Sequence, residues 1–368
     1  MPGAAIAQIR ADRATIDGAD LIAFAGCNYL GLAHDARVLE AVRDASHRFG
    51  LSSSASRETS GNTPAHEELE RGLVDFIAGH EVRTRGEIAG VLVPDGYTAN
   101  LAAAQGLSDR HPLALVDRRA HASLADAARC AGMRVRFFEH READDLRRAL
   151  LGEASRAVVM TDGVFTADGA IAPIADMLAV LRDGDTLLID DCHGFAVLGG
   201  GRGTCAHAGV NAVSERSRIV LTTTLAKGLG GGGGIVIGDS DWIRGVRTGS
   251  HAYVCTTPVS PIVAAGTVAA LGILRDEPER LERLAANARR LRCAMGRADS
   301  PVPICAHAVA DRPAGEALAA RLHAAGLFVP AMAYPGGPTP WYLRASVTSE
   351  HDPAEIDRLA PIFGELHD

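Results

Sequence analysis

Short apolar runs of strand length alternate with segments of helical period through most of the chain, and this alternation limits the possible folds. The apolar runs cover residues 88–93, 113–116, 156–161, 186–190, 218–222 and 234–237. The helical patterns occupy residues 36–49, 65–78, 98–107, 122–131, 143–151 and 174–182. Such alternation predicts an α/β fold in which a mostly parallel sheet carries helices on both faces.

The C-terminal part of the chain follows a different pattern, with longer helices and fewer strands. Its expected elements are helices at 258–274, 279–296, 314–325 and 353–366, strands at 302–309 and 341–347, and a Pro- and Gly-rich loop at 335–340. We therefore expect an N-terminal segment (1–35), a large domain (36–257), and a linking helix with a smaller α+β domain (258–368).

Composition excludes several classes of partner. The net charge of −8 gives no reason to expect nucleic acid or an anionic membrane surface as a partner. No uninterrupted apolar stretch reaches the ~18 residues of a membrane span, and the first residues lack a signal-peptide pattern. The seven cysteines include no Cys-x-x-Cys pair, so we expect reduced thiols, a cytoplasmic location and no metal site.

Polar or small residues follow several of the expected strands: Gly96, His121, Thr166, Asp190 and Lys227. In a parallel sheet, ligands bind beyond the carboxyl ends of the strands, so these residues are predicted to form one site. A lysine, an acid and a histidine are the groups that an enzyme using pyridoxal phosphate (PLP) needs. The lysine binds the cofactor aldehyde, the acid keeps the pyridine nitrogen protonated, and the histidine covers the ring.

Ordered motifs along nearly the whole chain, about residues 22–360, carry a family resemblance. They are Asn28-Tyr29-Leu30-Gly31-Leu32, Ser56-Arg57 with Ser60-Gly61-Asn62, His66, Leu69-Glu70, Gly96-Tyr97 with Ala99-Asn100, His121-Ala122-Ser123, Gly163-Val164-Phe165-Thr166 with Asp168-Gly169, Asp190 with His193, Thr224-Leu225-Ala226-Lys227-Gly228-Leu229-Gly230, and Leu343-Arg344 with Ser346-Val347. Together they resemble the α-oxoamine synthases, PLP enzymes that join an amino acid to an acyl thioester with loss of CO2. The resemblance implies PLP fold type I, the fold of aspartate aminotransferase.

The resemblance also assigns catalytic roles to four residues. It makes Lys227 the residue that binds the cofactor and the expected base for the α-proton, and Asp190 the partner of the pyridinium nitrogen. It places His121 on the ring and His193 near the phenolic oxygen of the cofactor. Asp191 is expected to be structural, because neighbouring residues of a strand point to opposite sides.

Further residues are expected to bind the cofactor and the substrate. For PLP the resemblance adds Gly96 and Tyr97 at a helix N-terminus, where backbone amides favour a phosphate, and also Thr166, Thr224, Thr256 and Thr257. Thr256 and Thr257 match residues that reach the phosphate of the neighbouring subunit, which implies a homodimer with shared active sites. Arg344 is expected to clamp the carboxylate of the amino acid, with Asn28 beside it.

The chain departs from the family pattern in two places. Asp95 stands where relatives have a small neutral residue, so its charge must point away from the phosphate. Ser52, Ser54 and Ala55 stand where relatives commonly have glycine, in a loop near the substrate pocket. We therefore expect an altered preference for the acyl group, which coenzyme A or an acyl carrier protein would deliver.

Other functions remain open on the sequence alone. Residues 186–191 could be the Walker-B-like strand of an ATPase, although Lys227 precedes its glycines and no phosphate-loop motif is present. A non-catalytic protein with the PLP fold is a second alternative. Within PLP chemistry, a 2-amino-3-oxobutyrate-type C–C lyase or ligase, or another amino-acid reaction in the same site, is the nearest alternative to an α-aminoketone synthase.

Overall fold

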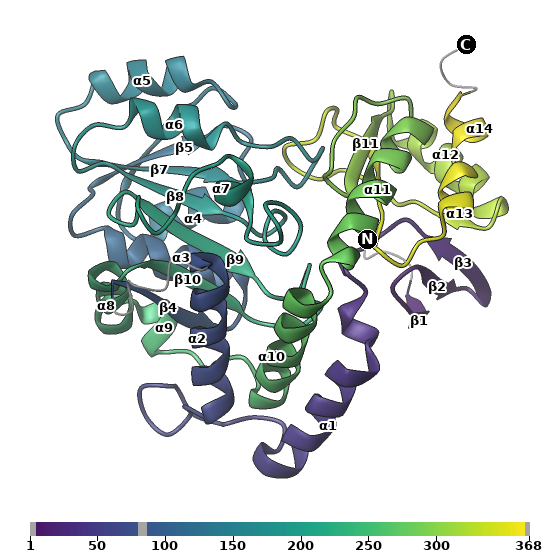
Figure 1. Cartoon of the computed structure of the whole chain (residues 1–368). Helices are drawn as coiled ribbons and strands as arrows, with labels where there is room; N and C mark the ends of the chain where they lie inside the picture. Colours follow the sequence, from purple (N-terminus) through teal and green to yellow (C-terminus); the bar gives the residue numbers. More distant parts are fainter. Residues whose placement is uncertain (1–4, 80–86, 365–368) are drawn as a thin grey trace.

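The computed structural model describes residues 5–79 and 87–364, which form three β-sheets and the helices around them. Figure 1 shows the large sheet and its helices on one side and the small sheets with the C-terminal helices on the other. Helices α1 (Ala36–Phe49) and α10 (Pro261–Asp276) lie side by side along the lower part of the view. No helix in these described ranges is long and apolar enough to cross a membrane.

The large sheet has seven strands in the order β4-β10-β9-β8-β7-β5-β6. In that order the strands are Ile88–Val93, Gly234–Asp239, Ile219–Thr224, Thr186–Asp190, Ala157–Asp162, Leu113–Asp117 and Arg134–Phe138. The neighbouring pairs from β9 to β6 are parallel, whereas β10 is antiparallel to both β4 and β9. The predicted α/β fold with a mostly parallel sheet is therefore confirmed.

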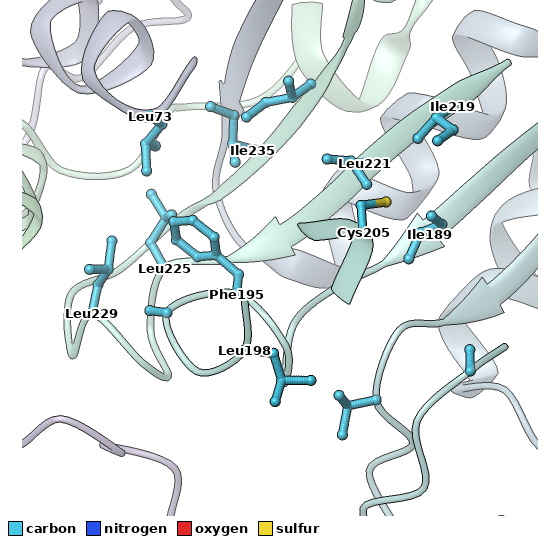
Figure 2. Close-up of a cluster of buried hydrophobic side chains, with 14 of the residues drawn as sticks. Leu73, Ile189, Phe195, Leu198, Cys205, Ile219, Leu221, Leu225, Leu229 and Ile235 are labelled. Carbon is cyan, nitrogen blue, oxygen red and sulfur yellow. The ribbon is translucent and has the colours of Figure 1, made fainter. Parts of the chain in front are cut away.

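Both faces of this sheet are buried. Along β8, Leu187 and Ile189 pack into one hydrophobic cluster, while Leu188 between them packs into the other. This alternation follows from the two-residue period of a strand, and it explains why the strands are almost wholly apolar. Figure 2 shows part of the first cluster, where Phe195 lies among side chains from the strands and Leu73.

Helices separate most of the strands, as the alternation predicts. The predicted ones are α2 (Pro64–Ala78), α3 (Gly96–Leu107), α4 (Ala122–Cys130), α5 (Ala143–Leu151) and α6 (Ile174–Val180). Helices α7 (Thr204–His207), α8 (Ser240–Gly249) and α9 (His251–Val254) were not predicted. Strand β6 was not predicted. It is an edge strand in which Arg134 and Arg136 are exposed and bind Glu153, so the strand lacks a continuous apolar run.

Two small sheets build the other part of the molecule. One has the order β1-β2-β3-β12 and the other β11-β14-β13. Their strands are β1 (Ile6–Ile9), β2 (Arg13–Ile16), β3 (Ala19–Ala23), β11 (Ile304–Ala308), β12 (Leu327–Phe328), β13 (Ala331–Met332) and β14 (Tyr342–Ser346). Because β3 pairs with β12, the N-terminal segment shares a sheet with the C-terminal part, and Phe24 enters the same core as Leu343.

The remaining helices follow the expected order, except that the short η1 was not predicted and the last expected helix needs a correction. They are η1 (Leu32–His34), α11 (Glu279–Ala294), α12 (Arg312–Ala324), α13 (Pro353–Asp357) and α14 (Ala360–Gly364). The single helix expected at 353–366 is wrong, because it is divided into α13 and α14. Pro361 lacks an N–H group and its ring obstructs the preceding turn, which accounts for the interruption. Residues 365 and 366 of that expected helix lie outside the described residues.

Candidate active site

One pocket of about 170 Å³ lies at the carboxyl ends of the parallel strands. The predicted residues that line it are Gly96, Tyr97, His121, Thr166, Asp190, His193, Thr224 and Lys227. These side chains come from separate strand ends and the loops that follow them, as expected for ligand sites in parallel sheets.

Asp190 ends β8 and is 6% exposed. Its Oδ2 accepts a hydrogen bond from Nδ2 of Asn100 over 2.7 Å, and its Oδ1 accepts one from the backbone N–H of Cys192 over 3.1 Å. The hydroxyl of Thr222 donates to Oδ1 of Asn100 over 2.6 Å, which fixes the orientation of the amide. Asn100 and Cys192 therefore fix the position of the Asp190 carboxylate, which lines the pocket.

Asp191 faces the other side of the same strand end. Its carboxylate accepts hydrogen bonds from the backbone N–H of Thr204, over 2.9 Å, and from the Thr204 hydroxyl. Burial raises the pKa of Asp191 to about 7. Asp191 does not line the pocket, so its contacts suit the structural role expected for it.

His121 caps the N-terminus of α4. Its Nδ1 contacts the Ser123 hydroxyl at 2.7 Å, and its backbone N–H donates to Oδ1 of Asp162 over 3.0 Å. Burial lowers the pKa of His121, so the neutral imidazole is favoured.

His193 is buried, with one ring nitrogen bound and the other without a partner. The hydroxyl of Tyr29, itself fully buried, lies 2.7 Å from Nδ1, while Nε2 has no hydrogen-bond partner in the described part of the chain. Burial, and after it the positive charges of Lys227 and Arg344, hold the pKa of His193 well below its usual range. Buried polar atoms are nearly always hydrogen-bonded, and Nε2 belongs to a residue that lines the pocket, so it can bind a ligand atom there.

Lys227 lies in the glycine-rich loop between β9 and β10. The loop is closed by hydrogen bonds from the Gly230 N–H to the Lys227 carbonyl and from the Gly231 N–H to the Leu225 carbonyl, over 2.9 and 3.0 Å. A Cβ on Gly231 would lie 2.1 Å from Oγ1 of Thr267, and one on Gly230 only 2.3 Å from a backbone nitrogen. These glycines therefore serve close packing, which fixes the path of the chain beside Lys227.

The N-terminus of α3 forms another wall of the pocket. A Cβ on Gly96 would lie 2.9 Å from Cβ of Thr224 and 3.0 Å from Sγ of Cys192, so only glycine fits against these two side chains. The carboxylate of Asp95 turns back to accept from the Thr98 N–H over 2.7 Å. The unusual acid at position 95 thus caps the helix and does not line the pocket.

Four predicted residues do not line the pocket. Arg344, in β14, donates from Nη1 to the carbonyl of Thr166 over 3.2 Å, which places it at the rim. Asn28 is bound within its own turn, since its Oδ1 accepts from the Ala33 N–H over 3.2 Å. The Thr256 hydroxyl donates to the Ala252 carbonyl over 2.9 Å, and Thr257 is exposed.

The pocket also includes residues that the sequence analysis did not select as site residues: Ser123, Asp162, Val164, Cys192 and Ala226. Asp162 is the most notable, because burial and the nearby charge of Asp190 raise its pKa well above the usual range for a carboxyl. It directly follows an expected strand, so the strand-end rule that selected Asp190 could also have identified it.

The pocket fits PLP on two independent observations. Nε2 of His193 is a buried polar atom without a partner, as a residue that meets the phenolic oxygen requires. Gly96 and Tyr97 line the pocket at the start of α3, where the N–H groups and the helix dipole favour a phosphate. Lys227 and Asp190 line the same pocket. Together with the start of α3, they match the aldehyde, the pyridine nitrogen and the phosphate that PLP carries on one ring.

Comparison with known proteins agrees with this reading. The family model for aminotransferase class I and II matches residues 19–363. An 8-amino-7-oxononanoate synthase of Methylococcus capsulatus is 37% identical over 358 residues, 94% of this chain and 89% of the relative. One from Chromohalobacter salexigens is 39% identical over 353 residues, 93% of this chain and 88% of the relative.

A solved structure of a PLP enzyme has the same fold. A serine palmitoyltransferase from S. paucimobilis with bound PLP and myriocin superposes with a TM-score of 0.90 at 26% identity, covering 99% of this chain and 92% of that one. The superposition extends over both parts of the molecule, and the serine palmitoyltransferase structure contains bound PLP. The chain therefore belongs to the aminotransferase class I and II family and, within it, to the PLP-dependent α-oxoamine synthases.

Proposed function

We propose that this protein condenses an amino acid with an acyl thioester, with loss of CO2, to give an α-aminoketone. The observation that carries the proposal is that Lys227, Asp190 and His193 line one pocket with a free Nε2 on the histidine. The names of the two relatives describe an amine and a ketone on adjacent carbons, which supports an α-aminoketone as the product.

Each catalytic residue has a separate task in this proposal. PLP, when bound, supplies the electron sink that stabilises a carbanion at the α-carbon. Lys227 would hold the cofactor through its aldehyde, and its amine would take the α-proton. Asp190, whose carboxylate is held by Asn100, would pair with the pyridine nitrogen. His121 would cover the ring, and Nε2 of His193 would bind the phenolic oxygen.

Phosphate binding falls to the N-terminus of α3 and to hydroxyl groups near it. Backbone N–H groups at Gly96 and Tyr97 and the hydroxyls of Thr166 and Thr224 would supply the donors. The capping role of Asp95 supports this assignment, because its carboxylate is already bound to the Thr98 N–H and is directed back along the helix.

Substrate recognition falls to Arg344 and Asn28. The guanidinium of Arg344 already lies next to Thr166 at the rim, and its planar shape suits two parallel hydrogen bonds to a carboxylate. The amide of Asn28 lies close to the lysine loop, since a Cβ on Gly230 would come within 2.8 Å of its Oδ1. These two contacts support the proposed role of Arg344 and Asn28 in binding the amino acid.

The assembly that we propose is a cytoplasmic homodimer with shared active sites. Thr256 and Thr257 lie outside the pocket of their own chain, which suits a contribution to the neighbouring subunit. Leu51 and Tyr97 are large hydrophobic side chains that are 79% and 45% exposed in the single chain, and a partner would cover such surface. The acyl group would arrive on coenzyme A or on an acyl carrier protein.

Turnover by the purified PLP-loaded protein tests the proposed function. A panel of amino acids is combined with acyl-CoA thioesters of increasing chain length, and released thiol and CO2 are measured together. We expect both in equal amounts with at least one pair of substrates, and neither from the Lys227→Ala variant. Thiol release without CO2 would instead favour the C–C ligase or lyase alternative, and no amino-acid reaction at all would favour a non-catalytic protein.

A further inference from the structure

A tyrosine from the small domain contacts the active-site histidine. The hydroxyl of Tyr334 lies 2.7 Å from Nε2 of His121, although the two residues are 213 positions apart. Tyr334 lies between β13 and β14, directly before the Pro- and Gly-rich loop at 335–340, and it is 38% exposed. The hydroxyl has no second hydrogen-bond partner within residues 5–79 and 87–364.

This loop is fixed to the large domain. Arg119 donates from Nε and Nη2 to the carbonyl of Gly336 over 3.0 and 2.6 Å, and its Nη2 also binds Asp168 over 2.8 Å. Asp168 follows the pocket residue Thr166 by two positions, so this anchor lies next to the pocket. The contact with His121 and the hydrogen bonds from Arg119 to Gly336 together fix the position of Tyr334.

The direction of the hydrogen bond follows from the atoms behind His121. Asn100 donates to Ser123 Oγ over 2.9 Å, and the Ser123 hydroxyl lies 2.7 Å from Nδ1 of His121. The backbone N–H of Ser123 also donates to Nδ1, over 3.3 Å, so Nδ1 is an acceptor. A neutral imidazole that accepts at Nδ1 carries its proton on Nε2. His121 therefore donates to the oxygen of Tyr334, and the Tyr334 proton remains available to another acceptor.

We propose that Tyr334 is a further residue of the active site, whose hydroxyl, held by Nε2–H of His121, donates a hydrogen bond to the carbonyl oxygen of the acyl thioester. This inference rests on the proposed condensation. When the carbon–carbon bond forms, the carbonyl electron pair moves to that oxygen, and it returns when the thiolate leaves. A donor at this position stabilises the oxygen while it carries negative charge.

The charges around the hydroxyl agree with this role. Burial raises the pKa of Tyr334, the positive charges of Lys227 and Arg344 lower it, and the carboxyls of Asp162 and Asp190 raise it. The phenol stays protonated near neutral pH and can donate. Two of these groups, Lys227 and Arg344, are the cations to which the proposed function assigns the cofactor and the amino-acid carboxylate.

The Tyr334→Phe variant tests the proposal, because it removes the hydroxyl and keeps the ring. Two rates are compared in PLP-loaded protein: condensation, and exchange of the amino-acid α-hydrogen with D2O in the absence of acyl thioester. We expect condensation to fall by about 100-fold, the size typical for loss of one oxyanion donor, with the exchange rate and the visible spectrum of bound PLP unchanged. Tyr342→Phe is the matched control, since the buried Tyr342 hydroxyl has no partner in the described part of the chain and both rates should keep their wild-type values.

The possible results separate this proposal from the function on which it rests. If Tyr334→Phe slows exchange and condensation equally, Tyr334 only supports His121 and the assigned donor role is wrong. Unchanged condensation would also overturn it. If wild-type protein exchanges the α-hydrogen but never condenses, both the proposed condensation and the donor role of Tyr334 are wrong.

Discussion

The carboxylate of Asp190 and the amide of Asn100 are joined by a 2.7 Å hydrogen bond between two buried side chains. The amide also binds Ser123 and Thr222, and Ser123 in turn contacts His121. Asn100 therefore helps to position both Asp190 and His121, so a substitution at one of these two residues should alter the position of the other.

Replacement of the two neighbouring acids should have unequal effects. Asp190→Asn removes the negative charge from the pocket, and we expect kcat to fall by about 100-fold or more while PLP still binds. Asp191→Asn should change kcat much less, because Asp191 binds Thr204 outside the pocket. The measurements are kcat for both variants and the visible spectrum of bound PLP. A larger loss in Asp191→Asn would mean that the roles of the two acids are exchanged.

Lys227 should be the attachment point of the cofactor. We expect the purified protein to be yellow, and borohydride treatment to fix the cofactor on a peptide that contains Lys227. The Lys227→Ala variant should be inactive and should lose its colour on dialysis, because only non-covalent contacts then hold PLP. Absorbance spectra and peptide mass spectrometry check both points. Full activity in this variant would contradict the lysine assignment.

Stability should depend on pH through Asp191. Burial raises its folded-state pKa to about 7, above the usual carboxyl value, so the folded state binds more protons than the unfolded one. Its contribution is therefore complete below about pH 4 and is lost as the pH rises to about 7. Relative to Asp191→Asn, the free energy of unfolding of the wild type should fall by up to ~1.4 kcal/mol per pH unit in this window. Denaturant titrations at several pH values measure it, and a parallel pH dependence in the two proteins would disprove it.

Assembly should be required for activity. Thr256 and Thr257 are expected to complete the phosphate site of the neighbouring subunit, so we expect a homodimer in solution. The double variant Thr256→Ala/Thr257→Ala should stay dimeric and bind PLP more weakly. Light scattering gives the mass, and dialysis against decreasing PLP gives the affinity. An active monomer at the assay concentration would contradict this prediction.

The loop at 52–55 should influence the choice of acyl group. Ser54 has φ of 53°, a left-handed conformation that favours glycine, and its N–H donates to the Ser52 hydroxyl over 3.0 Å. Glycine at position 54 should therefore be tolerated by the fold, whereas glycine at position 52 removes the acceptor of this hydrogen bond. We expect this triple variant to change the ratio of kcat/KM between acyl thioesters of different length, with PLP affinity retained. The same ratio in both proteins would leave the loop with a structural role only.

The sequence by itself determined the architecture of the large sheet and the edge of that sheet at which the site lies, but not the small sheet that joins the N-terminal segment to the C-terminal part. Parallel strands end at a common edge, so residues that follow apolar runs had to meet there, and Asp190, His193 and Lys227 do so. Local period and burial decide such features, and both can be read along the chain. Strand β6 was not predicted, because its two exposed arginines interrupt the apolar run that marks the other strands.

Only the tertiary structure decided which side chains touch. Asn100 reaches Asp190 across 90 positions, Tyr29 reaches His193 across 164, and Tyr334 reaches His121 across 213. No local pattern encodes these pairs, because each depends on how a helix or loop packs after the sheet has formed. The sequence placed the acid, the lysine and the histidines at one edge, and packing supplied the partners that orient them.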